Sequence, residues 1–203
     1  AEVRESRLRW LPWARRVHRL LLPLMPFAFE QMDLSEFDIV LSSSHSAAKG
    51  VITKPGTLHV SYCHSPMRYV WDHSHEYQKE YKNFAWLKWL YQPFLHKIRM
   101  WDRLAAERVD VFLANSKYIS KRIEKYYGRE SEVIYPPVDL SYFQVSKGER
   151  SGYVAVGRLI PYKRFDLLVQ LCTQKNIPLK VVGTGPELHR LKAMAGPSIE
   201  FLG

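Results

Sequence analysis

Residues 153–166 read Tyr-Val-Ala-Val-Gly-Arg-Leu-Ile-Pro-Tyr-Lys-Arg-Phe-Asp, and this stretch decides the fold class. An apolar run ends at Gly157 and an amphipathic stretch follows, which predicts a strand, a glycine turn and a helix. Such a turn can hold an anion, because free backbone N–H groups and the N-terminus of a helix both favour negative charge. Arg158 adds a positive charge on a planar, forked guanidinium, and Lys163 adds one on a compact ammonium group. The pattern suits the diphosphate of an activated donor.

The alternation of strands and helices continues on both sides of this stretch. Downstream we expect a helix over about 164–175, a strand over 179–182, a second glycine turn, a helix over 187–195 and a strand over 199–202. Upstream we expect strands over 37–42, 58–63, 109–114 and 132–135, and a helix that begins after Asn115-Ser116 and ends near Tyr127. This alternation predicts an α/β protein with parallel sheets and right-handed crossovers.

A long aromatic and basic region, residues 69–108, separates two of the predicted strands. Between residues 84 and 105 its apolar side chains recur at steps of three and four, which is typical of a helix. Pro93 interrupts this stripe, so we expect a kink, or two helices with Pro93 near the start of the second.

The composition favours an anionic partner. The 203 residues include 30 Lys and Arg and 20 Asp and Glu, which gives a formal net charge of +10. A phosphorylated small molecule, an acidic membrane surface or nucleic acid would each suit this charge. Cys63 and Cys172 are far apart and lie beside apolar residues, so we expect two buried, reduced thiols and a cytoplasmic protein.

Taken together, five segments of the chain resemble the retaining GT-B glycosyltransferases of family 4, and especially the bacterial mannosyltransferase branch. The segments are residues 42–50 (SSSHSAAKG), 62–72 (YCHSPMRYVWD), 114–116 (ANS), 133–139 (VIYPPVD), and 156–163 (VGRLIPYK) with 182–186 (VGTGP). Each alone is a weak signal, whereas all of them in the family's order make a specific one.

The resemblance implies a GT-B fold with two Rossmann-like, parallel-sheet domains. We expect an acceptor-side domain over residues 1–143, a polar linker over 144–152, and the start of a nucleotide-sugar-binding domain over 153–203. Family members open with a further strand and glycine-rich loop, and continue to a Glu-x7-Glu motif, neither of which is found here. Both domains are therefore expected to be incomplete, and this piece alone to be inactive.

For the donor, the resemblance implies that Arg158 and Lys163 stabilise the leaving diphosphate without a metal. Gly157, Gly183 and Gly185 are expected along the donor-binding site. The expected donor is a nucleotide-diphosphate sugar, GDP-mannose by branch resemblance, and no cofactor is expected. The pattern alone favours ordinary surface charges for both cations, and the second glycine turn could simply close a βα unit.

For the acceptor, the resemblance implies a role for His64, and the local sequence adds Arg68 and His45 as candidates. His64 follows a buried strand, at the edge where open α/β folds bind ligands, and is expected near the reacting sugar and the acceptor hydroxyl. Arg68 would grip an acceptor phosphate, or else pair with Asp72. The serine-rich turn around His45 would cradle an anion, or else cap a helix.

Other functions remain open at this stage. The Arg- and Trp-rich residues 7–25 favour contact with a membrane surface or a polyprenyl-linked acceptor, while the stripe over 84–105 is more typical of a core. His64, His73 and His75 match no metal-binding spacing, so no metal is expected. The alternatives to a glycosyltransferase are a non-catalytic fragment and a basic module for membrane or nucleic acid. Nucleic acid is not expected, because no recognised motif is found.

Overall fold

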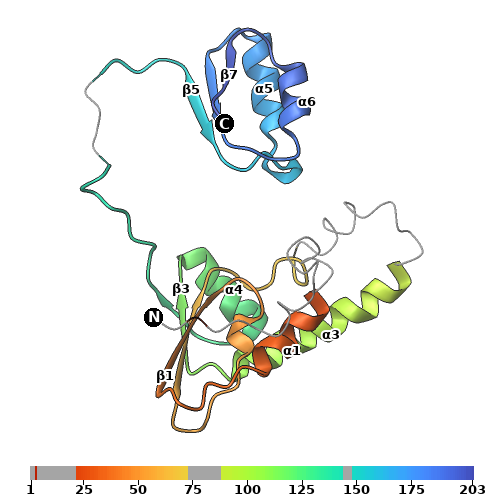
Figure 1. Cartoon of the computed structure of the whole chain (residues 1–203), viewed down its shortest axis with the longest axis vertical. Helices are drawn as coiled ribbons and strands as arrows, with labels where there is room; N and C mark the ends of the chain where they lie inside the picture. The colour runs from red at the N-terminus through yellow and green to blue at the C-terminus, as the bar shows by residue number, and fades with distance from the viewer. Residues whose placement is uncertain (1–2, 4–21, 73–87, 144–147) are drawn as a thin grey trace. The chain divides into compact units, whose positions relative to one another are not determined.

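The computed structural model describes residue 3 and residues 22–72, 88–143 and 148–203. The chain divides into two compact units, Ala1–Val138 and Asp139–Gly203 (Figure 1). Both are α/β with a parallel sheet, which confirms the predicted fold class.

The first unit contains a four-stranded parallel sheet in the order β1-β2-β3-β4. Its strands are β1 (Ile39–Ser44), β2 (Leu58–Cys63), β3 (Val111–Ala114) and β4 (Glu132–Val133). Its helices are η2 (Leu22–Leu24), α1 (Met25–Glu30), η3 (Ala47–Gly50), α3 (Lys88–Glu107) and α4 (Lys117–Tyr127). β2 lies where predicted, whereas β4 is shorter because the chain leaves the sheet before Pro136 and Pro137.

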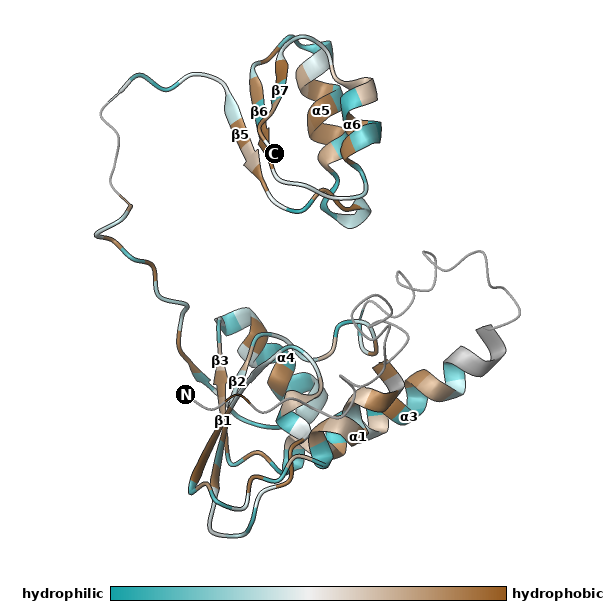
Figure 2. Cartoon of the chain, viewed as in Figure 1, coloured by the Kyte–Doolittle hydropathy of each residue, from teal (hydrophilic) through white to brown (hydrophobic). Residues whose placement is uncertain are grey.

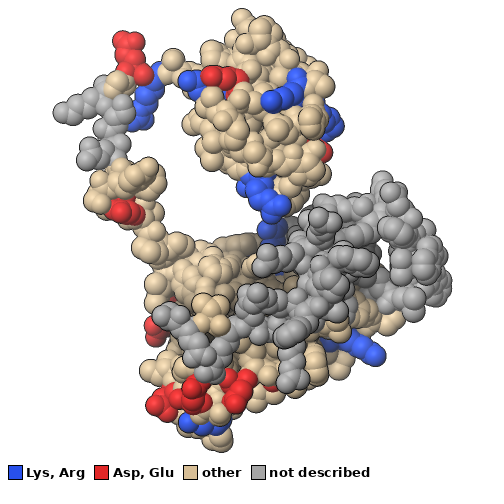
Figure 3. All heavy atoms as spheres, viewed as in Figure 1, with Lys and Arg blue, Asp and Glu red and all other residues tan. Residues whose placement is uncertain are grey.

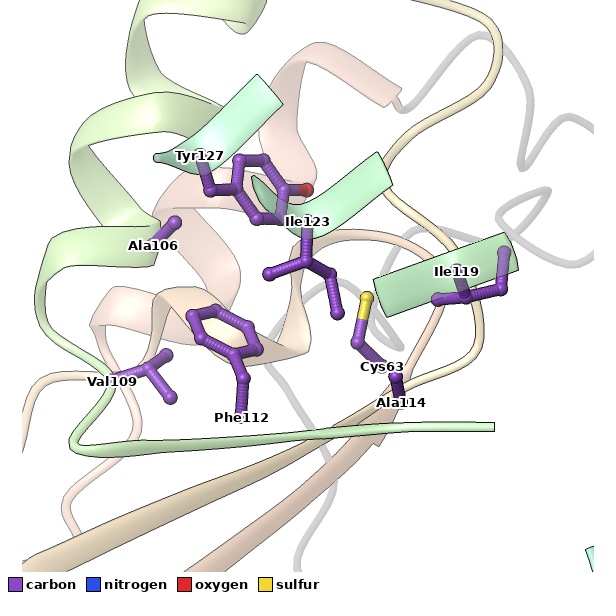
Figure 4. Close-up of a cluster of buried hydrophobic side chains, with 8 residues drawn as sticks. All are labelled: Cys63, Ala106, Val109, Phe112, Ala114, Ile119, Ile123 and Tyr127. Atoms are coloured by element: carbon purple, nitrogen blue, oxygen red, sulfur yellow. The ribbon is translucent and has the colours of Figure 1, made fainter. Parts of the chain in front are cut away.

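The core of the first unit lies between one face of the sheet and helices α3 and α4. Figure 4 shows the side chains that fill it, with the sulfur of Cys63 turned toward α4. Phe112 stacks on Tyr127 with ring centroids 5.8 Å apart, which joins β3 to the last turn of α4. The predicted burial of Cys63 is confirmed, and Cys172 is also buried in the second unit.

The opposite face of the same sheet is apolar and exposed. Ile39, Leu41 and Leu58 have exposed fractions of 65%, 66% and 43%. The helix-facing side, by contrast, carries the buried polar residues Ser42 and His59, whose Oγ and Nε2 atoms lie 2.9 Å apart. Parallel sheets are normally covered on both faces, and here the described residues cover one (Figure 2).

Helix α3 differs from its prediction at Pro93. The structure has one helix through this residue, so the expectation of two helices is wrong. Pro93 is only the sixth residue of α3, and a proline removes a single backbone hydrogen bond, the one to the carbonyl four residues earlier. That loss near the N-terminus is small beside the burial of Leu95, Ile98 and Ala105 further along the helix.

Helix α4 begins and ends where predicted. The hydroxyl of Ser116 accepts a hydrogen bond from the backbone N–H of Ile119 at 3.3 Å, as an N-cap does. Gly128 ends the helix with φ of 62°, in the left-handed region that favours glycine. The cap places Asn115 beside the carboxyl end of β2, where its side chain donates to the carbonyl of His64 at 3.2 Å.

The second unit contains three parallel strands in the order β5-β6-β7, with two helices on one face. Its elements are β5 (Tyr153–Val156), η5 (Pro161–Lys163), α5 (Phe165–Gln174), β6 (Leu179–Val182), α6 (Leu188–Met194) and β7 (Ile199–Phe201). All the predicted elements are present, within one residue at each end. Buried Leu159, Val169, Val181 and Leu191 form the centre of its core.

Candidate functional site

The turn after β5 brings Lys163 back over Gly157. A Cβ atom on Gly157 would lie 2.8 Å from Nζ of Lys163, so the ammonium group occupies the space that a side chain would fill. The short helix η5 causes this return, because it reverses the chain between the two residues. A positive charge is thereby held at the carboxyl end of β5, the edge of the sheet where α/β proteins bind ligands.

Arg158 and Lys163 are both exposed. Within the described residues, neither side chain takes part in an ion pair, whereas two other arginines of this unit are paired. Arg164 binds Asp166, with Nε and Oδ1 3.0 Å apart, and Arg190 binds Glu187. The charges of Arg158 and Lys163 are therefore available to an anionic ligand.

The N-terminus of α5 already has a negative partner. Asp166 lies in its first turn, where a carboxylate interacts favourably with the helix dipole. Hydrogen bonding from Arg164 lowers the pKa of the Asp166 carboxyl. An anion at this turn would thus depend on Arg158 and Lys163 more than on the helix terminus.

Gly183 and Gly185 have a packing role that the sequence did not reveal. A Cβ atom on Gly183 would lie 2.0 Å from the carbonyl oxygen of Gly157, and one on Gly185 would lie 2.3 Å from that of Leu159. The two loops are also hydrogen-bonded, from Gly157 N–H to the Val182 carbonyl at 2.9 Å. The glycines let the loops after β5 and β6 run in direct backbone contact beyond the strands.

In the first unit, His64 lies at the carboxyl end of β2 and is exposed. Its Nε2 atom is 3.0 Å from the hydroxyl of Ser43, at the end of β1. The ring of Tyr62 meets the imidazole edge to face, with centroids 5.2 Å apart. These contacts orient the imidazole at the sheet edge, as a residue that hydrogen-bonds a ligand requires.

Arg68 is exposed in the segment that follows β2. Asp72, its alternative partner, is held by both terminal nitrogens of Arg122, with Nη2 and Oδ1 3.0 Å apart. Arg122 is almost fully buried and packs its guanidinium 5.3 Å from the ring centroid of Tyr126. The carboxylate of Asp72 therefore serves to fix this segment to α4.

The turn around His45 uses its polar groups internally. The Ser44 hydroxyl accepts from the backbone N–H of Ser46 at 2.8 Å, and the Ser46 hydroxyl lies 2.8 Å from that of Tyr69. Ser46 is the N-cap residue of η3, but its hydroxyl makes no capping hydrogen bond to that helix. An anion here would have to displace these bonds, while the His45 side chain itself is exposed.

A buried polar network between η3 and α3 was not predicted. Asp102 is fully buried and accepts hydrogen bonds from Lys49, from Nε1 of Trp71 at 2.8 Å and from the Tyr127 hydroxyl at 2.9 Å. The Lys49 ammonium also lies 5.0 Å from the Tyr127 ring centroid. No sequence pattern signals this network, because its members are separated by tens of residues.

Several sequence predictions lie outside the described residues. They concern residues 7–21, His73, His75 and the part of the helical stripe before residue 88. In the described part of the chain, no group of three or more His, Cys, Asp or Glu could hold a metal ion. No helix of that part is long and apolar enough to cross a membrane.

The structure also has a hollow of about 540 Å³ at the opposite edge of the first sheet. It is lined by the start of β3 and the connection from α4 to β4, residues 110–112 and 128–132. None of the predicted site residues lies there.

Comparison with known proteins identifies the family. The model of Glycosyltransferase Family 4 matches residues 1–142. No curated protein matches the chain. Among solved structures, a mutant of S. aureus TarM in complex with fondaparinux, alpha-GlcNAc-glycerol and UDP is 15% identical, with a TM-score of 0.41. That match covers 53% of this chain and 24% of the TarM chain, so this chain spans about a quarter of that protein. Since the family model matches more than half of the 203 residues, the chain belongs to Glycosyltransferase Family 4.

Proposed function

We propose that the protein is a retaining, metal-independent hexosyltransferase that moves mannose from GDP-mannose to a saccharide or lipid-linked acceptor in surface polysaccharide or glycolipid synthesis. Membership of a glycosyltransferase family supports the transfer of a sugar. One observation carries the assignment of the donor site: Arg158 and Lys163 are exposed at the carboxyl end of β5, with no ion pair to any described residue.

In a transfer from a nucleotide sugar, the leaving diphosphate gathers negative charge as the anomeric C–O bond breaks. Positioned cations stabilise this charge in the transition state more than in the ground state, which accelerates the reaction. The guanidinium of Arg158 would hold two phosphate oxygens, and the ammonium of Lys163 would add a concentrated charge beside Gly157. Gly183 and Gly185 would line the donor site through their backbone.

On the acceptor side, His64 would hydrogen-bond the acceptor hydroxyl, and Arg68 would hold an acceptor phosphate. The fixed imidazole of His64 and the exposed guanidinium of Arg68 support these roles. His45 is the third proposed acceptor contact. We assign residues 1–143 to the acceptor-side domain, 144–152 to a linker and 153–203 to the donor side.

We place the reaction in the cytoplasm, at the inner face of the membrane where a polyprenyl-linked acceptor would lie. The exposed side chains of Leu24 and Phe27, 44% and 62% accessible, support contact with an apolar phase. A nucleic-acid partner is not proposed. On the face drawn in Figure 3, Lys and Arg of the second unit lie in separate places and form no continuous strip among the described residues.

The direct test is donor turnover by the full-length protein. Radiolabelled GDP-mannose is compared with UDP-glucose and UDP-N-acetylglucosamine, with membrane lipid extract as acceptor and EDTA present. We expect labelled product from GDP-mannose, with the anomeric configuration retained. Turnover of a UDP-sugar instead would correct the donor, and turnover of none of them would contradict the proposed function.

A further inference from the structure

In the segment from His64 to Asp72, the exposed residues His64, Arg68 and Asp72 are separated by residues that are buried or half-buried. His64 and Arg68 are exposed, whereas Met67 and Val70 have exposed fractions of 2% and 0%. A short loop that alternates in this way has its backbone fixed by packing, which limits where the exposed side chains can lie.

Arg99 of α3 holds the backbone of this segment. Its Nε and Nη2 atoms donate to the carbonyl of Val70 at 2.8 and 2.6 Å. Its guanidinium also lies 5.8 Å from the ring centroid of Trp71. No described carboxylate forms an ion pair with Arg99. Its guanidinium is therefore directed at the carbonyl of Val70.

The residues on either side of Arg68 are held as well. The Tyr69 hydroxyl lies 2.8 Å from that of Ser46 on the η3 side. Trp71 donates to Asp102 and stacks on Tyr126, with ring centroids 4.8 Å apart. Arg68 is thus a long exposed cation on a backbone anchored just after it, and such preorganisation reduces the entropy lost on binding a ligand.

We propose that Arg99 is a positioning residue of the acceptor site: by holding the Val70 carbonyl it sets the place from which Arg68 binds a phosphate group of the acceptor. This inference rests on the proposed function, in which Arg68 contacts the acceptor. Arg99 touches no substrate, and it acts through the peptide two residues beyond Arg68.

A double-mutant cycle in the full-length protein tests this, with farnesyl phosphate as a short polyprenyl phosphate probe. We expect Arg68→Ala and Arg99→Ala each to weaken binding about tenfold, the scale of one lost charge-assisted hydrogen bond. If Arg99 acts through Arg68, the double variant binds no more weakly than Arg68→Ala alone. Arg129→Ala is the matched control, because Arg129 also donates to backbone carbonyls, those of Ala106 and Asp110, at the opposite edge of the sheet.

Additive losses in the double variant would overturn the role of Arg99 and leave the proposed function standing. Absence of farnesyl phosphate binding by the wild type would overturn the proposed acceptor, and with it this role of Arg99.

Thiol labelling provides a readout that does not depend on a substrate. Trp71 packs against the cluster that contains Cys63, whose sulfur is enclosed (Figure 4). In a Cys172→Ser background, Arg99→Ala is expected to speed modification of Cys63 by about tenfold, because a looser segment opens more often. An unchanged labelling rate would show that Arg99 does not fix the segment.

Discussion

A side chain on Gly183 would collide with the backbone of Gly157, because a Cβ atom there would lie 2.0 Å from the Gly157 carbonyl oxygen. Two loops that belong to different βα units therefore meet without side chains between them. This contact places the turn that carries Arg158 against the turn after β6, and so defines the shape of the proposed donor site.

Replacing Gly183 by Ala should consequently destabilise the second unit. The nearest atoms all belong to the backbone of Gly157 and not to a flexible side chain, so the loops must separate, at a cost of roughly 1–3 kcal/mol. Urea unfolding measures this cost. Gly56→Ala is the matched control, since nothing lies within 4 Å of a Cβ atom at that position and no loss of stability is expected. Equal midpoints for the two variants would contradict the close approach.

Asp102→Asn should be far more destabilising than the loss of a surface ion pair. The buried Lys49 ammonium would be left without a countercharge, which costs about 3–5 kcal/mol. Glu187→Gln breaks the more exposed pair with Arg190 and is expected to cost about 1 kcal/mol or less. Thermal unfolding of the two variants compares the two losses of stability. Similar shifts in Tm would show that the buried network around Asp102 does not stabilise the first unit.

His59 should make the first unit sensitive to acid. Burial lowers the pKa of its imidazole, and the nearby carboxylate of Asp110 opposes this only in part. Below about pH 6.5 the imidazole of His59 binds a proton in the unfolded chain but stays neutral in the folded protein. The contribution of His59 to the free energy of unfolding is therefore complete above that pH, and it is lost as the pH falls through the lowered folded-state pKa. Unfolding free energies between pH 7 and pH 5 measure the slope.

The matched variants for this pH effect are His59→Gln and His189→Gln. The first removes the buried imidazole and should flatten the slope, whereas the second removes an exposed histidine of the second unit and should leave it unchanged. A slope that survives in His59→Gln would assign the acid sensitivity to other groups.

Local patterns sufficed to predict the strands of this fold and helices α4, α5 and α6, but not α1 or the course of α3 through Pro93. The strand Leu58–Cys63 and the cap at Ser116 follow from alternation and from side-chain chemistry within a few residues. The bond from Trp71 to Asp102 joins positions 31 residues apart, and no local pattern encodes such a contact. For the same reason, the sequence does not reveal that the glycines of the second turn approach the backbone of the first turn.

In the proposed function, Arg158 stabilises the leaving diphosphate. The most direct test of this role is turnover of GDP-mannose by full-length Arg158→Ala, with Arg190→Ala as control because Arg190 is also exposed in this unit but is already paired with Glu187. We predict that Arg158→Ala lowers kcat by roughly 100-fold or more with an unchanged Tm, the scale for removing one transition-state donor, and that Arg190→Ala stays within a few-fold of wild type. Near-normal turnover by folded Arg158→Ala would contradict the account.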